Sequence, residues 1–390
     1  MSDQETYRRF IDWLKQSWWG LPEAQELLPL LKATYTSEEA ALLTEFPYDS
    51  IYLEDLAEIR QIEIEELKSR LDALARKGLV YRTIKDGRYR YKINDPYFVF
   101  MRSSFWAGPT DERSSSIAPW VNKYYYNGFY NNWNLTHWKG LRVLPVEQTI
   151  KDTRQILPYE EVVKVLDSAC YFAVSTCACR QRKKLDPDFA DCQYPGHDGS
   201  YEICLHFDRL GRYTVEAGLG REITREEAHN ILRECAEAGL VHGISNWQEG
   251  PDTICNCCRD CCLMFEAVHK LGHAEGFTPS DYIVHTNSAT CIGCGLCAKR
   301  CPMGALYLGD YPSSKNRITR VKSKEFKNKT GKVSLLNADL CIGCGVCAYK
   351  CPTESLILER RKTTENIPKT PGELVERLAV DFAAGKAQHQ

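Results

Sequence analysis

Apolar side chains recur at helical spacing between residues 37 and 78, which predicts three helices in succession. The first begins at Ser37, and the second covers residues 53–59. The third ends near Gly78, a residue that commonly stops a helix. Its apolar positions lie three or four residues apart: Ile64, Leu67, Leu71 and Leu74. Helices with this pattern bury their apolar side against a neighbouring element, so we expect the three to pack into one small core.

A β-hairpin is predicted directly after the third helix. Residues 79–85 and 88–93 have the composition of two strands, and Asp86-Gly87 between them favours the tight turn of a hairpin. Three helices followed by a hairpin resemble winged-helix domains in general. We therefore expect a winged-helix-like domain over residues 37–95.

The rest of the chain predicts an α+β fold with several domains. Residues 96–154 are rich in aromatic side chains and poor in basic ones, so we interpret them as a connector packed between domains rather than as a surface that stacks on nucleic acid. The predicted layout is a helical extension (1–36), the winged-helix-like domain (37–95), the connector (96–154), a cysteine-rich α+β domain (155–285), a module with an internal repeat (286–358) and a tail with one weakly amphipathic helix (359–390).

Composition and charge exclude several classes of protein. A length of 390 residues, a hydrophobic fraction of 43% and a net charge of −2 fit a globular protein of several domains and indicate no particular partner. The polar N-terminus lacks the apolar core of a signal peptide, and no run of about 18 apolar residues occurs. We therefore expect a cytoplasmic protein without a membrane span. In that reducing setting, its 19 cysteines indicate metal binding rather than disulfides.

The internal repeat carries the clearest chemistry. The segments CIGCGLCAKRCP and CIGCGVCAYKCP begin at Cys291 and Cys341, and both follow the pattern C-x2-C-x2-C-x3-C-P. In proteins with this spacing, three cysteines of one run bind one [4Fe–4S] cluster and the fourth binds the cluster of the other run. Two ligand sets are therefore predicted: Cys291, Cys294, Cys297 and Cys351 for one cluster, and Cys341, Cys344, Cys347 and Cys301 for the other. A pair of zinc sites is the alternative, but zinc does not require a repeated, proline-terminated spacing.

A basic segment separates the two runs. Residues 313–333 contain eight lysines and arginines, and Glu325 is their only acidic residue, which gives a net charge of +7. This segment could attract an acidic redox partner electrostatically, or it could be a solvated hairpin.

A second set of nine cysteines is a candidate for further metal binding. Its members are Cys177, Cys179, Cys192, Cys204, Cys255, Cys257, Cys258, Cys261 and Cys262. Cys255, Cys258 and Cys261 repeat the C-x2-C-x2-C spacing and could bind three irons of another cubane cluster, with a fourth thiolate from Cys192 or Cys204. The adjacent pairs point apart and could instead serve two metal centres or a non-cubane cluster. An additional iron–sulfur cluster is favoured over zinc and over a thiol redox or structural role.

Other residues near these cysteines are weaker candidates. His197 and His206 lie among them in the sequence and are possible ligands. Cys170 and Cys235 lie on apolar stretches, so we interpret them as small core residues. The sequence does not indicate any catalytic residue.

The arrangement as a whole resembles a group of multidomain 4Fe–4S binding proteins from anaerobic bacteria, and the repeat module looks like bacterial dicluster ferredoxins. The shared segments are C-x-C-R at residues 177–180, G-L-G-R-E-I-T at 218–224 and C-N-C-C-x-x-C-C at 255–262. The resemblance implies cytoplasmic electron transfer in an oxygen-poor setting, beside a larger redox enzyme. It does not imply a small-molecule substrate.

We therefore expect an electron-transfer protein, or a subunit of an oxidoreductase system, that passes low-potential electrons to or from a redox enzyme. One alternative is a redox-sensing winged-helix transcription regulator, and another is a reductase with a catalytic cluster in the middle domain. The regulator is disfavoured because the third helix begins with Glu63, Glu65 and Glu66, and residues 37–95 carry a net charge of −3. Acidic side chains repel the phosphates that a recognition helix must approach, so nucleic acid is not an expected partner.

Overall fold

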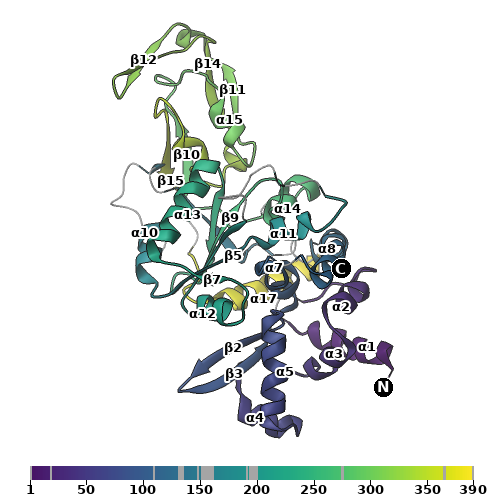
Figure 1. The fold of residues 1–390 in the computed structure, drawn as a ribbon. Helices are drawn as coiled ribbons and strands as arrows, with labels where there is room; N and C mark the ends of the chain where they lie inside the picture. Colours follow the sequence, from purple (N-terminus) through teal and green to yellow (C-terminus); the bar gives the residue numbers. More distant parts are fainter. Residues whose placement is uncertain are drawn as a thin grey trace. The chain divides into compact units, whose positions relative to one another are not determined.

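The structure is a computed structural model in which helices and strands are mixed along the chain (Figure 1). It describes residues 2–17, 20–108, 110–130, 136–146, 149–150, 162–189, 192, 201–273, 276–362 and 366–388. The chain divides into two compact units, which we describe separately. The first contains residues 1–138, 171–224 and 375–390, and the second contains residues 139–170 and 225–374. None of the helices in the described ranges is both long and apolar enough to cross a bilayer.

The first unit begins with five helices and a small antiparallel sheet with the strand order β1-β3-β2. Its elements are α1 (Asp3–Leu14), α2 (Leu27–Thr34), α3 (Ser37–Leu43), β1 (Ile51–Tyr52), α4 (Leu53–Arg60), α5 (Ile64–Arg76), β2 (Val80–Lys85) and β3 (Arg88–Ile93). The helices and the hairpin expected between residues 37 and 95 are all present, and the winged-helix assignment itself stays a prediction.

The helix α5 and the hairpin β2–β3 are held together by a shared core and a shared carboxylate. Leu67, Leu71 and Leu74 of α5 are buried, as their spacing predicts. Asp72 accepts hydrogen bonds from Arg82 of β2 at 3.0 Å and from Tyr91 of β3 at 2.8 Å. The turn of the hairpin has positive φ at both Asp86 and Gly87, which is the geometry of the two-residue turns that match strand twist.

The aromatic stretch that follows lies within the first unit and is largely core. Its elements are α6 (Pro96–Phe98), the π-helical turn η1 (Val99–Ser103), α7 (Ser104–Trp106), α8 (Glu112–Tyr124) and a second π-helical turn, η2 (Tyr125–Phe129). Phe100, Trp106, Tyr124 and Tyr125 are almost fully buried. Burial of these rings, rather than stacking on a ligand, accounts for the aromatic composition of the segment.

The remainder of the first unit is built on the antiparallel strands β6-β5-β7. These are β5 (Phe172–Thr176), β6 (Glu202–Phe207) and β7 (Arg221–Glu222), and α11 (Ala178–Lys184) and α12 (Asp208–Glu216) accompany them. β5 is buried over most of its length. Cys170 precedes the strand and is exposed, so its interpretation as a core residue is wrong.

The second unit contains the strands β4-β8-β9 and the module with the internal repeat. Its first elements are β4 (Leu141–Leu144), α10 (Val162–Ser168), α13 (Arg225–Ala238), β8 (Val241–Ser245), β9 (Thr253–Cys257) and α14 (Leu263–Leu271). Cys235 on α13 is buried, as expected. The final helix of the chain is α17 (Pro371–Gln388).

The repeat module consists of three two-stranded antiparallel ribbons and two short helices (Figure 1). The ribbons pair β10 (Tyr282–Thr286) with β15 (Leu356–Arg360), β11 (Leu306–Asp310) with β14 (Lys332–Leu336), and β12 (Ile318–Val321) with β13 (Lys324–Lys327). The helices are α15 (Leu296–Arg300) and α16 (Val346–Tyr349). The central part of the basic segment therefore forms the hairpin β12–β13.

Arg300 ties the module to the rest of the second unit. Its guanidinium donates to the carbonyl of Val346 at 3.2 Å and to that of Ala236, near the end of α13, at 2.9 Å. A cation at the carboxyl end of a helix satisfies carbonyls that lack a partner within the helix and interacts favourably with the helix dipole. Both repeat helices are thereby fixed to α13, since Arg300 ends α15 and Val346 begins α16.

Candidate metal centres

Each cysteine run of the module folds into a tight loop followed by a short helix. The loop that starts at Cys291 leads into α15, and the loop that starts at Cys341 leads into α16. Gly293 and Gly343 occupy equivalent positions with φ of +62° and +71°. A Cβ atom on Gly343 would overlap the carbonyl oxygen of Tyr282 in β10, and one on Gly293 would overlap that of Lys332 in β14. Glycine is therefore needed for both the backbone angle and the close approach of each loop to its strand.

Two cavities of equal size lie against these loops, each with about 330 Å³ of empty space that includes its open mouth. The first is lined by Cys341, Cys344, Cys347 and Cys301, and the second by Cys291, Cys294, Cys297 and Cys351. We call them the Cys341 site and the Cys291 site. Each site therefore contains three cysteines from one run and the fourth from the other, which is the grouping that the spacing predicts. That these cysteines bind clusters stays a proposal.

The chemistry of both cavities fits a cationic, thiophilic group. Burial raises the pKa of the Cys344 thiol to about 12 and moves the pKa of Cys347 in the same direction. A metal that supplies positive charge in such a space favours the thiolate forms that bind it. Apolar side chains cover each space: Ile342, Val284 and Leu358 at the Cys341 site, and Ile292, Leu308 and Leu356 at the Cys291 site.

Several polar groups lie within hydrogen-bond reach of the cysteine sulfurs. The backbone N–H of Ser334 donates to Cys291 Sγ at 3.4 Å, and the hydroxyl of Ser334 lies 3.3 Å from Cys297 Sγ. At the other site, the N–H of Ala305 donates to Cys301 Sγ at 3.2 Å. Such contacts favour the thiolate and tune the redox potential of a metal that it binds.

The two sites differ in exposure. Cys294 at the Cys291 site is exposed, whereas Cys344 and Cys347 at the Cys341 site are both 8% exposed. The loop of the Cys341 site also contacts another part of the second unit, since the N–H of Val146 donates to the carbonyl of Cys344 at 3.1 Å. The Cys291 site is therefore the one that other molecules can approach more closely.

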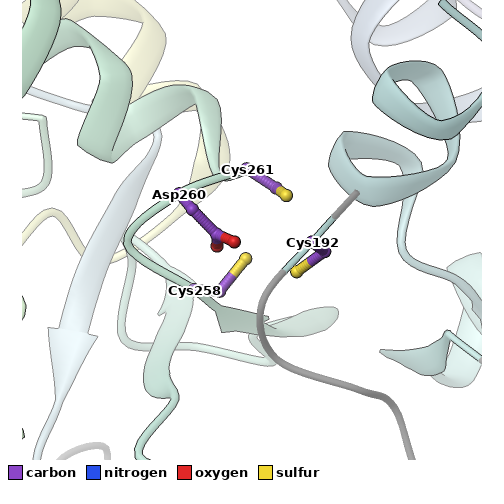
Figure 2. Close-up of side chains that lie close together, drawn as sticks. All are labelled: Cys192, Cys258, Asp260 and Cys261. Carbon is purple, nitrogen blue, oxygen red and sulfur yellow. The ribbon is translucent and has the colours of Figure 1, made fainter. Parts of the chain in front are cut away.

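The cysteines between residues 255 and 262 lie at the end of β9 and on the loop before α14. Ligand atoms of Cys258, Asp260 and Cys261 lie within 4.8 Å of one another. Figure 2 shows these side chains close together. Cys192, which Figure 2 also labels, follows α11 in the first unit. Asp260 was not predicted as a ligand, and its position between Cys258 and Cys261 was the only sequence signal for it.

Cys255 lies beside Cys257, whose thiol shares hydrogen bonds with Cys255 and Cys262. These contacts, and then burial, raise the pKa of the Cys257 thiol well above its ordinary value. Residues 255 and 257 share one face of β9, and residue 258 has already left the strand. The cubane expected at Cys255, Cys258 and Cys261 stays a prediction.

The other predicted ligands of this set lie in the first unit. Cys177 is the residue before α11, Cys179 lies in its first turn, and Cys204 is buried in β6. His206 is fully buried, where its Nε2 lies 2.7 Å from Ser175 Oγ and its ring packs on Trp106. His206 is not part of the metal-ligand group found among the described residues, and His197 lies outside them.

Comparison with known proteins agrees with the geometry of the module. Residues 290–355 match a family model described as a 4Fe-4S dicluster domain. An uncharacterized ferredoxin of Methanocaldococcus jannaschii is 31% identical over 85 residues, which are 21% of this chain and 48% of that protein. The chain thus spans about half the length of this curated relative. No solved structure matches the chain. The C-terminal module is therefore similar to ferredoxin domains that bind 4Fe–4S clusters.

Proposed function

We propose that this protein transfers electrons through two [4Fe–4S] clusters, one at the Cys341 site and one at the Cys291 site. The observation that carries the proposal is the pair of equal cavities, each lined by four cysteines drawn from both runs. Bound there, the clusters would supply one-electron redox chemistry at low potential. The physiological partner in this proposal is a redox enzyme in the cytoplasm.

The residues around the two sites have distinct roles in this proposal. The eight cysteines bind the irons, and Gly293 and Gly343 allow each loop to lie close to its strand. Ser334 and Ala305 stabilise negative charge on sulfur by donating hydrogen bonds to it. Ile342 and Ile292 exclude water from the metal. Because the environments differ, we expect the two sites to differ in potential.

The exposed Cys291 site is the proposed exit for electrons, and the basic hairpin β12–β13 beside it is the proposed docking surface. The Thr319 hydroxyl in β12 donates to the carbonyl of Thr290 at 3.1 Å, and the amide of Asn328 donates to the carbonyl of Cys291 at 3.1 Å. These bonds fix the hairpin to the loop of the Cys291 site. Its net positive charge, with Ile318 56% exposed among the basic side chains, fits an acidic protein with an apolar contact.

The metal content of protein purified anaerobically tests the proposed function. We expect about eight irons and eight acid-labile sulfides from the module, and two one-electron reductions visible by electron paramagnetic resonance. The substitutions Cys344→Ser and Cys294→Ser should each remove the signal of one site and leave that of the other. A module that contains only zinc, or that accepts no electrons, would contradict the proposal.

The proposed docking surface can be tested without knowing the partner. The reduced protein is mixed with ferricyanide, an anionic oxidant, and separately with hexaamminecobalt(III), a cationic one. Replacing Lys324 and Lys327 with glutamate should slow the first reaction and speed the second at low salt, and salt should weaken both effects. The double variant Arg76→Glu and Lys85→Glu, in the first unit, is the matched control. Equal rates for the two double variants would rule out steering by the hairpin.

A DNA-binding role is not proposed. The first turn of α5 carries Glu65 and Glu66, and Glu63 caps the helix by accepting from the backbone N–H of Glu66 at 2.9 Å. This end of the helix is therefore negatively charged, which opposes contact with phosphate.

A further inference from the structure

The turn between β9 and α14 brings two cysteines to the same side of the chain. β9 ends at Cys257 and α14 begins at Leu263. Between them, the N–H of Cys262 donates to the carbonyl of Cys258 at 3.2 Å, which closes a single helical turn. Residues three apart in such a turn lie on one face, so Cys258 and Cys261 are neighbours. Both cysteines are 2% exposed.

Asp260 belongs to the same group. Its carboxylate and the sulfurs of Cys258 and Cys261 all lie within 4.8 Å of one another. Figure 2 shows the three side chains together on this loop. Asp260 is half-buried, whereas its neighbour Arg259 is exposed. The turn therefore gathers two thiols and one carboxylate in one place and keeps its basic side chain at the surface.

The carboxylate decides which chemistry this group favours. Cys258 and Cys261 form a C-x2-C pair, a spacing that serves either as a redox-active disulfide or as a pair of metal ligands. A redox-active cysteine requires a thiolate near neutral pH. The negative charge of Asp260 opposes the formation of a thiolate beside it. A bound cation reverses this relation, because it attracts the carboxylate and both thiolates at once.

The donor set also indicates the kind of metal. Thiolates are soft donors, and a carboxylate is a hard one. Zinc accepts sulfur, nitrogen and carboxylate oxygen in its tetrahedral sites. Copper(I) and iron–sulfur clusters are held mainly by sulfur, so a carboxylate among the ligands favours zinc over both.

We propose that Cys258, Asp260 and Cys261 bind a single metal ion, and that zinc is the ion this donor set fits best. The inference goes beyond the proposed function and does not depend on the clusters of the module. Binding of the ion releases the two thiol protons to solvent, so two thiolates and one carboxylate offset its charge.

Metal analysis of the full-length protein, purified anaerobically with its module loaded, tests this assignment. We expect one zinc per chain in addition to the iron of the module. The double variant Cys258→Ala with Cys261→Ala should contain no zinc and should keep the iron and its spin signal. Zinc content and the spin signal are separate readouts, so failure here is distinguishable from failure of the proposed electron transfer.

The variant Asp260→Asn tests the carboxylate, because it keeps the size of the side chain and removes its charge. It should bind Zn²⁺ at least about tenfold more weakly, since even the loss of a group that only supports a ligand has an effect of that size. Competition with a zinc-selective chromophoric chelator measures the affinity. Arg259→Gln is the matched control, because it changes an exposed charge in the same turn, and it should bind zinc at least as tightly as the unmodified protein.

Four results would overturn the proposal. Equal weakening by Asp260→Asn and Arg259→Gln would show that Asp260 is not a ligand. Additional iron accompanied by equal acid-labile sulfide, both lost in the double variant, would identify a cluster instead of a single ion. A zinc-free protein in which mass spectrometry finds Cys258 linked to Cys261 would identify a redox-active disulfide. Unchanged zinc in the double variant would place the ion elsewhere.

Discussion

Replacing Gly343 with alanine tests how closely the loop of the Cys341 site must approach β10. Gly343 has a φ of +71°, and its Cβ would overlap the carbonyl oxygen of Tyr282 and the hydroxyl of Ser280. Neither neighbour can retreat easily. The Ser280 hydroxyl donates to the carbonyl of Gly343 at 2.9 Å, and the N–H of Ser280 donates to that of Ile342 at 3.1 Å.

The expected cost has two parts. An alanine at left-handed φ costs about 1–2 kcal/mol, and forcing an extra methyl group against packed atoms costs about 1–3 kcal/mol. Gly343→Ala should therefore destabilise the second unit by about 2–5 kcal/mol. Gly304→Ala is the matched control, since Gly304 has a φ of +67° but a Cβ there would meet nothing within 4 Å. It should show only the first part of the cost, about 1–2 kcal/mol.

Anaerobic unfolding in guanidinium chloride, followed by circular dichroism, measures the difference between the two variants. Iron analysis before unfolding adds a local readout, because the displaced loop should lose iron from the Cys341 site while the Cys291 site keeps its own. Equal unfolding midpoints and equal iron contents for Gly343→Ala and Gly304→Ala would show that the close approach to β10 has no energetic importance.

Three further predictions concern single side chains. Ser334→Ala removes a hydroxyl 3.3 Å from Cys297 Sγ, so a redox titration should show a lower potential for the Cys291 site alone; an equal shift at both sites would contradict this. Arg300→Met removes the contacts to α13 and should lower the stability of the second unit by about 1–3 kcal/mol in denaturant unfolding, with Lys299→Met as the control. Burial acts to raise the pKa of Asp72, but hydrogen bonds from Lys68, Tyr91 and Arg82 outweigh it and hold that pKa below its usual value. The stabilisation by ionised Asp72 is complete above about pH 4 and is lost as the pH falls through the folded-state pKa. Asp72→Asn should therefore be less stable than the unmodified protein at pH 7, and its free energy of unfolding should fall less on acidification. An unchanged dependence of stability on pH would refute this reasoning.

Local sequence signals predicted the three helices and the hairpin between residues 37 and 95 because the stabilising interactions there are local. Asp86-Gly87 adopts positive φ whatever surrounds it, and the leucines of α5 define one buried face by their spacing alone. The grouping of cysteines around each cavity of the module was predictable for a similar reason. The same spacing in both runs favours the same loop geometry. Cys301 and Cys351 therefore line the cavities that their positions in the repeat indicate.

In the segment around residue 258, spacing alone did not indicate which side chains lie beside one another, because that depends on where a strand ends. β9 ends at Cys257, and the thiol of Cys257 contacts Cys255 and Cys262. Asp260 was missed because a carboxylate in a cysteine-rich segment resembles a solvated side chain. Cys170 was assigned to the core from apolar neighbours, but it precedes β5 and lies on the surface.

The unequal exposure of the two sites in the module also implies an order of damage. Dissolved oxygen and chelators reach Cys294 at the surface before they reach Cys344, which is buried. On brief exposure to air we therefore expect the protein to pass through a half-loaded form in which only the Cys341 site retains its iron. A preparation in that form would keep its fold and accept electrons, yet it would lack the site through which they leave, so it would fail as a carrier while appearing intact.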